Sequence, residues 1–281
     1  MQEKRLLYKM IFDVGSSNYT FIHNSNISGS NLSDVNSIVL SHWHYDHTGG
    51  LYKVLEQIKD EVQIICHEFA KSERFFRRSD EIKITSLLGK TRLEIFPLLS
   101  TSKIVNQKPI NMKKIEDLNG NIVFNKKSYE LLNINGFRII VAGEIPRIHH
   151  IEDFKTFCLL QDDVIKNDSI LDDKCIILEY EDKAILLTGC CHSGIMNTLD
   201  YIKSLTDKPI SHLIGGFHMA NASNQRIKKT IEYLMTFQKY KNPLYLFPIH
   251  CSGEKFLHEL IRANSPDLKP FNASVGTVFT F

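Results

Sequence analysis

The chain has 281 residues, of which 43% are hydrophobic and 23% are charged, an ordinary composition for a globular protein. Its 34 basic and 32 acidic residues leave a formal net charge of +2 and are mixed along the sequence, so charge gives no reason to expect a nucleic-acid or anionic-membrane partner. No apolar run approaches the roughly 20 residues that a membrane-spanning helix requires.

The first residues and the cysteines both indicate a cytoplasmic protein. Only seven mostly apolar residues separate the charged start of the chain from Asp13, which is too short a run for a signal peptide. The six cysteines are sparse and include the adjacent pair Cys190 and Cys191, which is not the pattern of a disulfide framework. We therefore expect reduced thiols.

The first part of the chain predicts strands that alternate with a helix. Short apolar runs at 6–12, 38–40 and 63–66 are typical of buried strands. Between the last two, residues 51–58 carry apolar side chains at the i, i+3, i+4, i+7 spacing of a helix that is packed on one side. This order of strand, loop and helix is the unit from which layered α/β folds are built.

Residues 79–135 are polar, rich in Lys and Asn and only weakly periodic, so we treat them as an insertion of uncertain structure. A strand at 137–142 follows, and then strands at Cys175–Tyr180 and 184–188, whose polar connection indicates a hairpin. The remaining expected elements are helices at 195–204, 225–237 and 254–261 and strands at 212–214, 244–249 and 277–281. Without repeats or a Pro/Gly-rich linker, the sequence predicts one domain spanning 1–281.

Four side chains that can bind a metal stand within six residues, directly after the strand at 38–40. They are His42, His44, Asp46 and His47, in the pattern H-x-H-x-D-H. In an extended segment His42 and His44 point to the same side, because side chains alternate with period two. Imidazole nitrogen and carboxylate oxygen suit zinc, and also iron or manganese. Packing explains one such histidine but not four ligands together, so the segment predicts a site for one or two metal ions.

This pattern resembles the signature of the metallo-β-lactamase superfamily, which implies an α/β (α+β) fold, a four-layer αββα sandwich with metals at the mouth between its sheets. Residues 12–15 resemble the first motif of that family, whose Asp supports the metal loop, and residues 40–50 resemble the second. Further segments resemble the dihydropteroate-synthase-like branch of metal-dependent hydrolases, namely 143–147, 172–173, 188–194, 215–218 and 248–253.

The resemblance also implies which later histidines complete the metal site. In the family, one metal takes two motif histidines and a later His, and the other takes the motif Asp and His with a C-terminal His. Carried over to this chain, the first set is His42, His44 and His192, and the second set is Asp46, His47 and His250. Both later histidines follow a predicted strand, which is where α/β folds place ligands.

The chain departs from the family in two places. Where most members carry a bridging Asp, this sequence has Cys190, which is either a soft ligand that selects zinc or a small buried residue beside a weak or absent second metal. Family members usually have a longer opening before the Asp13 motif. A missing first strand would expose a sheet edge that a homo-oligomer could cover.

Three residues near the later motifs are further candidates. His218 follows two glycines, and we predict that it faces the substrate as a general acid, with metal ligation and a structural role as alternatives. Arg147 is expected to bind a substrate phosphate through its planar guanidinium, although an ordinary salt bridge is the competing explanation. Glu144 ends a predicted strand and is expected to support or replace a ligand.

The sequence thus predicts an enzyme that acts on a small molecule. The first hypothesis is a hydrolase that directs a metal-activated hydroxide at a phosphoester or carbonyl group, with Asp46 also orienting the nucleophile. The alternative is a dihydropteroate-synthase-like enzyme that joins a dihydropterin pyrophosphate to an aminobenzene ribosyl phosphate.

Two other functional classes are alternatives to these enzymes. A nucleic-acid-processing enzyme is disfavoured because only 57 residues separate His192 from His250, which leaves no room for the extra domain of such relatives. A non-catalytic metal- or ligand-binding protein is the second alternative, and a closed, Cys-rich site would favour it.

Overall fold

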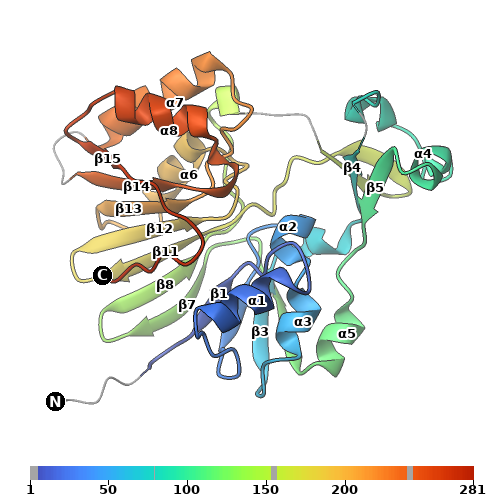
Figure 1. Cartoon of the computed structure of the whole chain (residues 1–281), viewed down its shortest axis with the longest axis horizontal. Helices are drawn as coiled ribbons and strands as arrows, with labels where there is room; N and C mark the ends of the chain where they lie inside the picture. Colours follow the sequence, from blue (N-terminus) through green and yellow to red (C-terminus); the bar gives the residue numbers. More distant parts are fainter. Residues whose placement is uncertain (1–5, 79, 153–156, 239–242) are drawn as a thin grey trace. The chain divides into compact units, whose positions relative to one another are not determined.

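The computed structural model describes residues 6–78, 80–152, 157–238 and 243–281, and its contacts divide the chain into two compact units (Figure 1). Unit 1 is Met1–Phe124 with Phe154–Asp172, and unit 2 is Asn125–Asp153 with Asp173–Phe281. Each unit has its own parallel or mixed sheet, its own helices and its own buried apolar cluster. The predicted α/β class is confirmed.

Unit 1 is built on sheet A, a four-stranded parallel sheet in the order β1-β2-β3-β6. Its strands are β1 (Met10–Phe12), β2 (Ser37–Val39), β3 (Val62–Cys66) and β6 (Gly120–Phe124). Its helices are α1 (Thr20–Ile27), α2 (Tyr45–Thr48), α3 (Leu51–Leu55) and α5 (Met112–Asp117), with a 3-10 turn η1 (Glu68–Lys71) after β3. The predicted apolar stripe is buried on α3, although the regular helix ends at Leu55.

Sheet B is a smaller antiparallel sheet of unit 1, in the order β10-β9-β4-β5. Its strands are β4 (Arg74–Arg77), β5 (Ile104–Gln107), β9 (Cys158–Gln161) and β10 (Val164–Asn167), accompanied by η2 (Ile84–Leu87) and α4 (Phe96–Ser100). It has a separate apolar cluster that includes Phe75, Leu87 and Ile104. Sheet B therefore has a hydrophobic core of its own, separate from that of sheet A.

Unit 2 is built on sheet C, a mixed seven-stranded sheet in the order β15-β14-β13-β12-β11-β8-β7. Its strands are β7 (Tyr129–Ile134), β8 (Phe137–Val141), β11 (Cys175–Tyr180), β12 (Lys183–Thr188), β13 (Ile210–Gly215), β14 (Leu244–Pro248) and β15 (Leu268–Pro270). The predicted hairpin is confirmed, because Tyr180 pairs with Lys183 across a two-residue turn. From β12 to β15 all neighbouring strands are parallel, so their carboxyl ends share one edge.

The helices of unit 2 are α6 (Ile195–Ile202), α7 (Asn224–Gln238) and α8 (Glu254–Arg262), with 3-10 turns η3 (His150–Glu152) and η4 (His250–Ser252). Helix α7 packs against both α6 and α8, as Figure 1 shows. These three helices agree with the sequence prediction to within two residues at each end. Of the helices that the structure describes, none combines the length and the apolar character that crossing a bilayer requires.

The region 79–135, which carried no clear sequence pattern, contains regular structure. It supplies η2, α4 and β5 to the surroundings of sheet B, α5 and β6 to sheet A and β7 to sheet C. Strands β5, β6 and β7 each lie at the edge of a sheet, and most of their side chains are half-buried. Such strands lack the strong apolar alternation by which a strand is recognised.

One predicted strand is shorter than expected, and another was wrong. The run 6–12 forms a strand only at Met10–Phe12, and Leu6 and Leu7 are exposed because sheet A offers no partner there. Residues 277–281 form no strand, since β15 already occupies the place beside β14. The aromatic side chains of this last segment pack instead, with the Phe279 ring 4.8 Å from that of Phe247.

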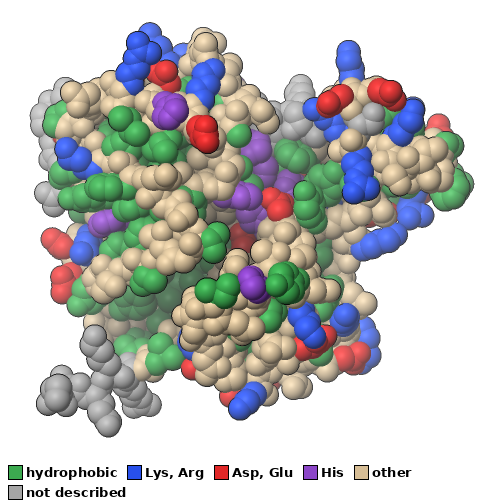
Figure 2. Space-filling model, viewed as in Figure 1, with side chains coloured by type: hydrophobic (Ala, Val, Ile, Leu, Met, Phe, Trp, Pro, Cys, Tyr) green, Lys and Arg blue, Asp and Glu red, His purple; other side chains and the backbone are tan. Residues whose placement is uncertain are grey.

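Charged side chains of both signs are interspersed on the face that Figure 2 shows. Among the described residues, charged side chains also form local ion pairs, such as Lys203 with Asp200 at 2.7 Å and Lys103 with Glu81 at 3.2 Å. This agrees with the even mixture of charge along the sequence.

Candidate functional site

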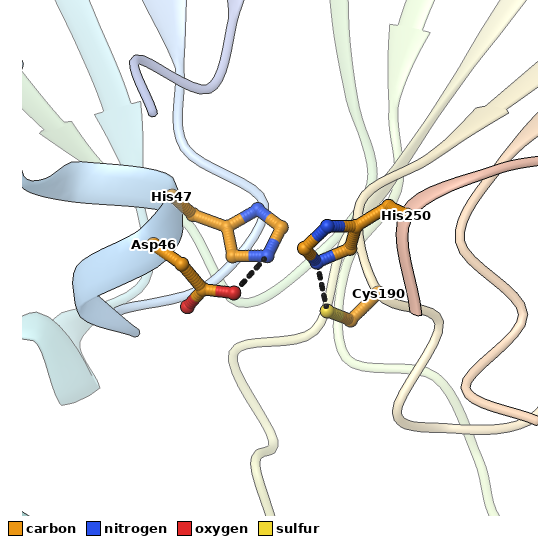
Figure 3. Close-up of side chains that lie close together, drawn as sticks. All are labelled: Asp46, His47, Cys190 and His250. Carbon is orange, nitrogen blue, oxygen red and sulfur yellow. Dashed lines mark hydrogen bonds and ion pairs between the residues drawn. The ribbon is translucent and has the colours of Figure 1, made fainter. Parts of the chain in front are cut away.

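Four of the predicted ligands lie in the segment that follows the parallel strand β2. The chain bends after the strand, His44 is the residue before α2, and α2 carries Asp46 and His47. The ring of His42 lies 4.4 Å from that of His44 and 4.2 Å from that of His47, centroid to centroid. All three imidazoles are buried, whereas the Asp46 side chain is one-third exposed. Its Oδ2 lies 3.5 Å from His47 Nε2 (Figure 3).

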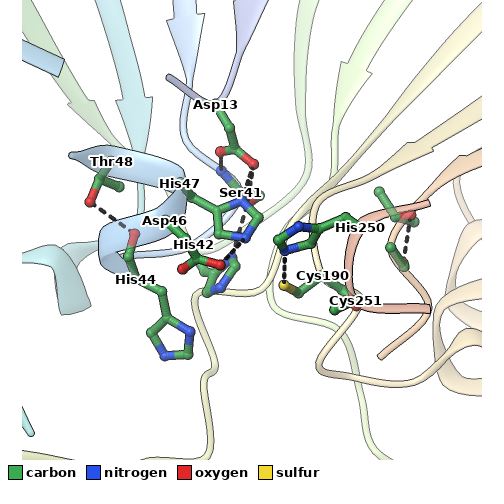
Figure 4. Close-up of polar contacts among 12 residues, drawn as sticks. Asp13, Ser41, His42, His44, Asp46, His47, Thr48, Cys190, His250 and Cys251 are labelled. Atoms are coloured by element: carbon green, nitrogen blue, oxygen red, sulfur yellow. Dashed lines mark hydrogen bonds and ion pairs between the residues drawn. The ribbon is translucent and has the colours of Figure 1, made fainter. Parts of the chain in front are cut away.

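Asp13, at the end of β1, holds this segment through a network of short contacts (Figure 4). Its two carboxylate oxygens accept hydrogen bonds from the backbone N and the Oγ of Ser41, each at 2.7 Å. His47 Nδ1 lies 2.6 Å from Asp13 Oδ2, and His42 Nδ1 lies 2.9 Å from Ser41 Oγ.

These contacts define the protonation of both rings. Since the single hydroxyl hydrogen of Ser41 is donated to Asp13, His42 Nδ1–H is the donor to Ser41 Oγ. A carboxylate can only accept, so His47 Nδ1–H is the donor to Asp13. The lone pair of each neutral ring is then on Nε2, the form in which a histidine binds a metal while a second group orients it.

The glycines after the histidines allow this network to form. A side chain at Gly50 would place its Cβ only 2.4 Å from Val14 O, and one at Gly49 would lie 2.2 Å from Ser16 O. The chain after β1 also closes on the segment through the hydrogen bond from Val14 N to His47 O. Asp13 itself has a φ of 61°, a costly conformation for a residue with a side chain. The backbone here is shaped to bring Asp13 to the histidines.

A buried ion pair supports the same segment from sheet B. The Arg74 side chain is 1% exposed, and its guanidinium donates to Asp168 Oδ2 at 2.6 Å and to both oxygens of Asp172 at 2.8 and 2.9 Å. Arg74 also donates to Trp43 O, and Asp172 Oδ2 accepts from Trp43 N at 2.7 Å. The peptide groups between His42 and His44 are thus fixed by charged partners.

In unit 2, the remaining predicted ligands follow the ends of three adjacent parallel strands. Cys190 and His192 follow β12, His218 follows β13 and His250 follows β14. Backbone hydrogen bonds of 2.9 Å join these loops, from Gly216 N to Gly189 O and from Ile249 N to Gly215 O. Strand ends that are far apart in sequence therefore meet within one unit.

Three residues of these loops have left-handed backbone conformations. The φ values are 58° at Cys191, 48° at His218 and 54° at His250. None of them is a glycine, so each conformation costs free energy and is maintained by the surrounding structure. Such backbone strain clusters at functional sites more often than elsewhere.

The side chains of these loops converge. Cys190 Sγ lies 3.2 Å from His250 Nε2 (Figure 3). The rings of His192 and His218 are 4.3 Å apart. Cys190, His218 and Cys251 each offer a ligand atom, and the three atoms lie within 4.8 Å of one another.

Asp173 supports the loop that carries His192. Its Oδ2 accepts a hydrogen bond from Ser193 N at 2.7 Å, and burial raises the pKa of this carboxyl. Arg147 Nη1 donates to His192 O at 2.9 Å. The adjacent residues Asp172 and Asp173 therefore each fix one ligand-bearing loop, the first in unit 1 and the second in unit 2.

A second buried carboxyl lies at the start of α6. Glu152 accepts hydrogen bonds from Met196 N at 3.1 Å and Asn197 N at 2.9 Å, in the first turn of the helix. Burial raises the pKa of Glu152, although these backbone donors oppose that shift. Gly194 leaves room for the carboxyl, because a Cβ there would lie 2.1 Å from it. Glu152 caps α6 and had no signal in the sequence analysis.

Cys251 is the other residue that the sequence analysis did not select. Its Sγ lies 3.4 Å from Cys190 O, and its side chain is partly buried. A hydrogen bond from the Cys190 side chain, the His218 hydrogen bond and the nearby His250 lower the pKa of Cys251 to about 4 against the effect of burial. Its position next to His250, directly after a strand end, is the signal that could have identified it.

The two further candidates, Arg147 and Glu144, have different surroundings. Arg147 is bound to the His192 carbonyl, so it supports a ligand loop whatever else it contacts. Glu144 lies half-buried just beyond β8, where its backbone N donates to Lys126 O. A role for either residue in substrate binding stays a prediction.

Residues 9–124 match the family model of the metallo-beta-lactamase superfamily. An uncharacterized protein of Methanocaldococcus jannaschii is 29% identical over 92% of this chain and 84% of its own length. The 7,8-dihydropterin-6-methyl-4-(beta-D-ribofuranosyl)-aminobenzene-5'-phosphate synthase of the same organism is 26% identical over 97% of this chain and 84% of its own.

Among solved structures, Tm1679, described as a metal-dependent hydrolase of the beta-lactamase superfamily, superposes with a TM-score of 0.69. The match covers 96% of this chain and 87% of the other at 17% sequence identity. At that identity the likeness concerns the fold.

Proposed function

The chain belongs to the metallo-β-lactamase superfamily, and from that membership we propose that it is a metal-dependent hydrolase of a small molecule with a phosphoester or carbonyl group.

The donor set fits a divalent transition metal. The segment after β2 offers three buried imidazoles and the Asp46 carboxylate, and unit 2 offers imidazoles and thiols at its strand ends. Nitrogen and sulfur donors of this kind favour zinc, and iron or manganese are the alternatives. When bound, the ion supplies a water molecule that is acidic enough to react at neutral pH and polarises the substrate oxygen.

We assign the ligands in two sets. His42, His44 and His192 would hold one ion, and Asp46, His47 and His250 would hold the second. Asp46 would also orient the attacking water, because its carboxylate can accept a hydrogen bond from an O–H group. His218, whose ring packs beside that of His192, would donate a proton to the departing group.

The observation that carries this proposal is the pair of contacts that His42 Nδ1 makes with Ser41 Oγ and His47 Nδ1 makes with Asp13 Oδ2. In the neutral rings these contacts favour the hydrogen on Nδ1, which leaves the Nε2 lone pair for a metal. A buried histidine that only packs does not need a carboxylate to select its tautomer, whereas a metal ligand gains basicity and orientation from one.

Turnover tests this proposal. The metal-reconstituted protein would be assayed with bis(p-nitrophenyl) phosphate, p-nitrophenyl phosphate and p-nitrophenyl acetate, before and after chelation. We expect hydrolysis of at least one substrate that is lost on chelation and restored by zinc, iron or manganese. Turnover by the chelated wild type and by the His42→Ala/His44→Ala variant that equals that of the metal-loaded wild type would contradict the proposal.

The second candidate is a pterin-condensing synthase. It is favoured by the 26% identity to the named archaeal synthase over 97% of this chain. In this reaction Arg147 would bind a phosphate of the substrate through its guanidinium. Incubation with a dihydropterin pyrophosphate and an aminobenzene ribosyl phosphate distinguishes the two candidates, because only the synthase forms the coupled product with release of pyrophosphate.

We further propose that the enzyme works in the cytoplasm on a diffusible small molecule. None of the six cysteines forms a disulfide within the described residues, which agrees with a reducing compartment. A homo-oligomer that covers the edge of sheet A beside β1 is also proposed. Equilibrium sedimentation of the purified chain would show it, and a monomer at all concentrations would contradict it.

A further inference from the structure

Cys251, at one of the strand ends of unit 2, has no role in the proposed hydrolase site, and it lies beside two side chains that can also bind a metal. The proposed ligand sets take histidines and one carboxylate, and neither includes Cys251. Yet Cys190, His218 and Cys251 offer two sulfur atoms and one imidazole nitrogen within 4.8 Å of one another. All three residues belong to unit 2.

The backbone brings these three side chains together. Gly216 precedes His218 by two residues, and a Cβ at Gly216 would lie 2.8 Å from Cys251 Sγ and 3.1 Å from Cys190 Cα. Only a glycine therefore lets the two cysteines approach across the β13 loop. The Cys251 carbonyl in turn accepts hydrogen bonds from Met219 N and Ala220 N, both at 3.1 Å, which fixes the chain beyond His218.

The nature of the donors selects the ligand. Two thiolates and an imidazole match soft or borderline ions such as zinc, cadmium and cobalt, and they are poor ligands for magnesium or calcium. His250 Nε2 lies 3.2 Å from Cys190 Sγ, but it is a ligand of the proposed hydrolase centre and is not counted in this set. The neighbouring thiol Cys191 is not part of it, because its Sγ lies 3.3 Å from Thr198 Oγ1 inside the core of unit 2.

We propose that Cys190, His218 and Cys251 form a thiophilic metal-binding site that belongs to unit 2 alone. An ion bound there occupies the imidazole of His218. If His218 donates a proton in the proposed hydrolase reaction, occupancy of this site inhibits turnover. That consequence rests on the proposed function, whereas metal binding at the site does not.

Cobalt binding provides the direct test. Metal-free protein would be titrated with Co²⁺ under anaerobic, reducing conditions, and the thiolate-to-cobalt charge-transfer absorption would be recorded. We expect a band in the wild type that falls by roughly half in Cys251→Ser, because one of two thiolate ligands is removed. The band should vanish in Cys190→Ser/Cys251→Ser.

Two controls separate this site from the predicted hydrolase ligands. Cys191→Ser removes the adjacent buried thiol and should leave the band unchanged. His42→Ala/His44→Ala removes ligands of the proposed hydrolase centre in unit 1 and should also leave it unchanged. A band absent from the wild type, or one that is lost in the double His variant and kept in Cys251→Ser, would overturn the proposal.

A measurement on the unmodified chain covers the case in which a variant does not fold. Cd²⁺ should slow alkylation of Cys251 by iodoacetamide several-fold, as read by mass spectrometry of the peptide that contains it. Equal alkylation rates with and without Cd²⁺ would contradict the site. Inhibition of turnover by Cd²⁺ that is relieved in Cys251→Ser would then test the role of His218 separately.

Discussion

The two units assemble their candidate ligands in different ways. Unit 1 presents His42, His44, Asp46 and His47 from one short segment, and a carboxylate and a hydroxyl fix the tautomers of two of these rings. Unit 2 gathers Cys190, His218 and His250 from three strand ends, joined by backbone hydrogen bonds. The first arrangement depends on supporting side chains and the second on strand topology.

This difference has a physical consequence. In unit 1 a single substitution of a supporting residue should disturb several ligands at once, because they share one network. In unit 2 the ligands are held by the sheet edge and by strained loops, so substitutions of individual side chains should act locally. The following predictions test this contrast.

The largest effect is expected for His42→Ala/His44→Ala. Removal of two of the proposed ligands of one ion should lower metal-dependent turnover by about 10³-fold, since a catalytic metal contributes several kcal/mol. Steady-state kinetics with the best substrate of the panel would measure it. His23→Ala replaces an exposed histidine of α1 in the same unit and should change turnover little. Wild-type turnover in the double variant would show that His42 and His44 take no part in the mechanism.

Arg74→Met should give the largest loss of stability. The substitution leaves two buried carboxylates, Asp168 and Asp172, without their cation, which typically costs about 3–5 kcal/mol. Urea unfolding would measure the free energy change. Arg77→Ala, on the same strand but 56% exposed, is the matched control and should cost less than about 1 kcal/mol. Equal losses for the two variants would mean that the buried network does not support unit 1.

Asp13→Asn tests the tautomer argument without removing a ligand. The amide cannot serve as the carboxylate acceptor for both Ser41 and His47, so metal affinity should fall by about 10–100-fold. Competition with a chromophoric chelator would report this affinity. Asp34→Asn replaces an exposed carboxylate that pairs with Lys9 in the same unit, and it should leave the affinity unchanged. Unaltered metal affinity in Asp13→Asn would contradict the proposal that Asp13 orients the histidine ligands.

The smallest effect concerns Asp200 on α6 in unit 2. Burial raises the pKa of this carboxyl, but hydrogen bonds from Lys203, Tyr233 and His149 outweigh it and lower the pKa to about 2. Because the folded pKa lies below the unfolded value, the stabilisation is complete above about pH 4–5 and is lost as the pH falls toward 2.

Asp200→Asn should therefore cost about 1–2 kcal/mol at pH 7 and less at pH 3. Unfolding curves at both pH values would measure it. Asp207→Asn removes an exposed carboxylate after α6 and is the matched control, which should cost less than about 0.5 kcal/mol at pH 7. A constant difference between wild type and Asp200→Asn from pH 7 to pH 3 would contradict the lowered pKa.

The same contrast explains which candidate site residues could be predicted from the sequence. The candidate ligands of unit 1 lie within six residues and follow a buried strand, so their spacing alone predicted a metal-binding segment. His192 and His250 were identified through resemblance and strand ends. Cys251 was not, because only the strand order of sheet C brings it beside Cys190 and His218.

The errors in the fold prediction have a related cause. The edge strands β5, β6 and β7 could not be predicted, because their side chains are mostly half-buried and lack a clear apolar alternation. The apolar segment 277–281 looked like a strand, but its phenylalanines pack as side chains and its backbone joins no sheet. The apolar periodicity of the sequence therefore predicted the buried strands and helices. It failed for segments in which pairing with another strand decides whether a strand forms.

Metal analysis of the purified chain tests the central claim most directly. The wild type, expressed with added zinc, iron or manganese and freed of loosely bound ions, would be analysed by inductively coupled plasma mass spectrometry beside His42→Ala/His44→Ala. We predict at least one equivalent of transition metal in the wild type and a clear loss in the variant. A wild-type chain that holds no transition metal under any of these conditions, or a variant that holds as much as the wild type, would contradict the account.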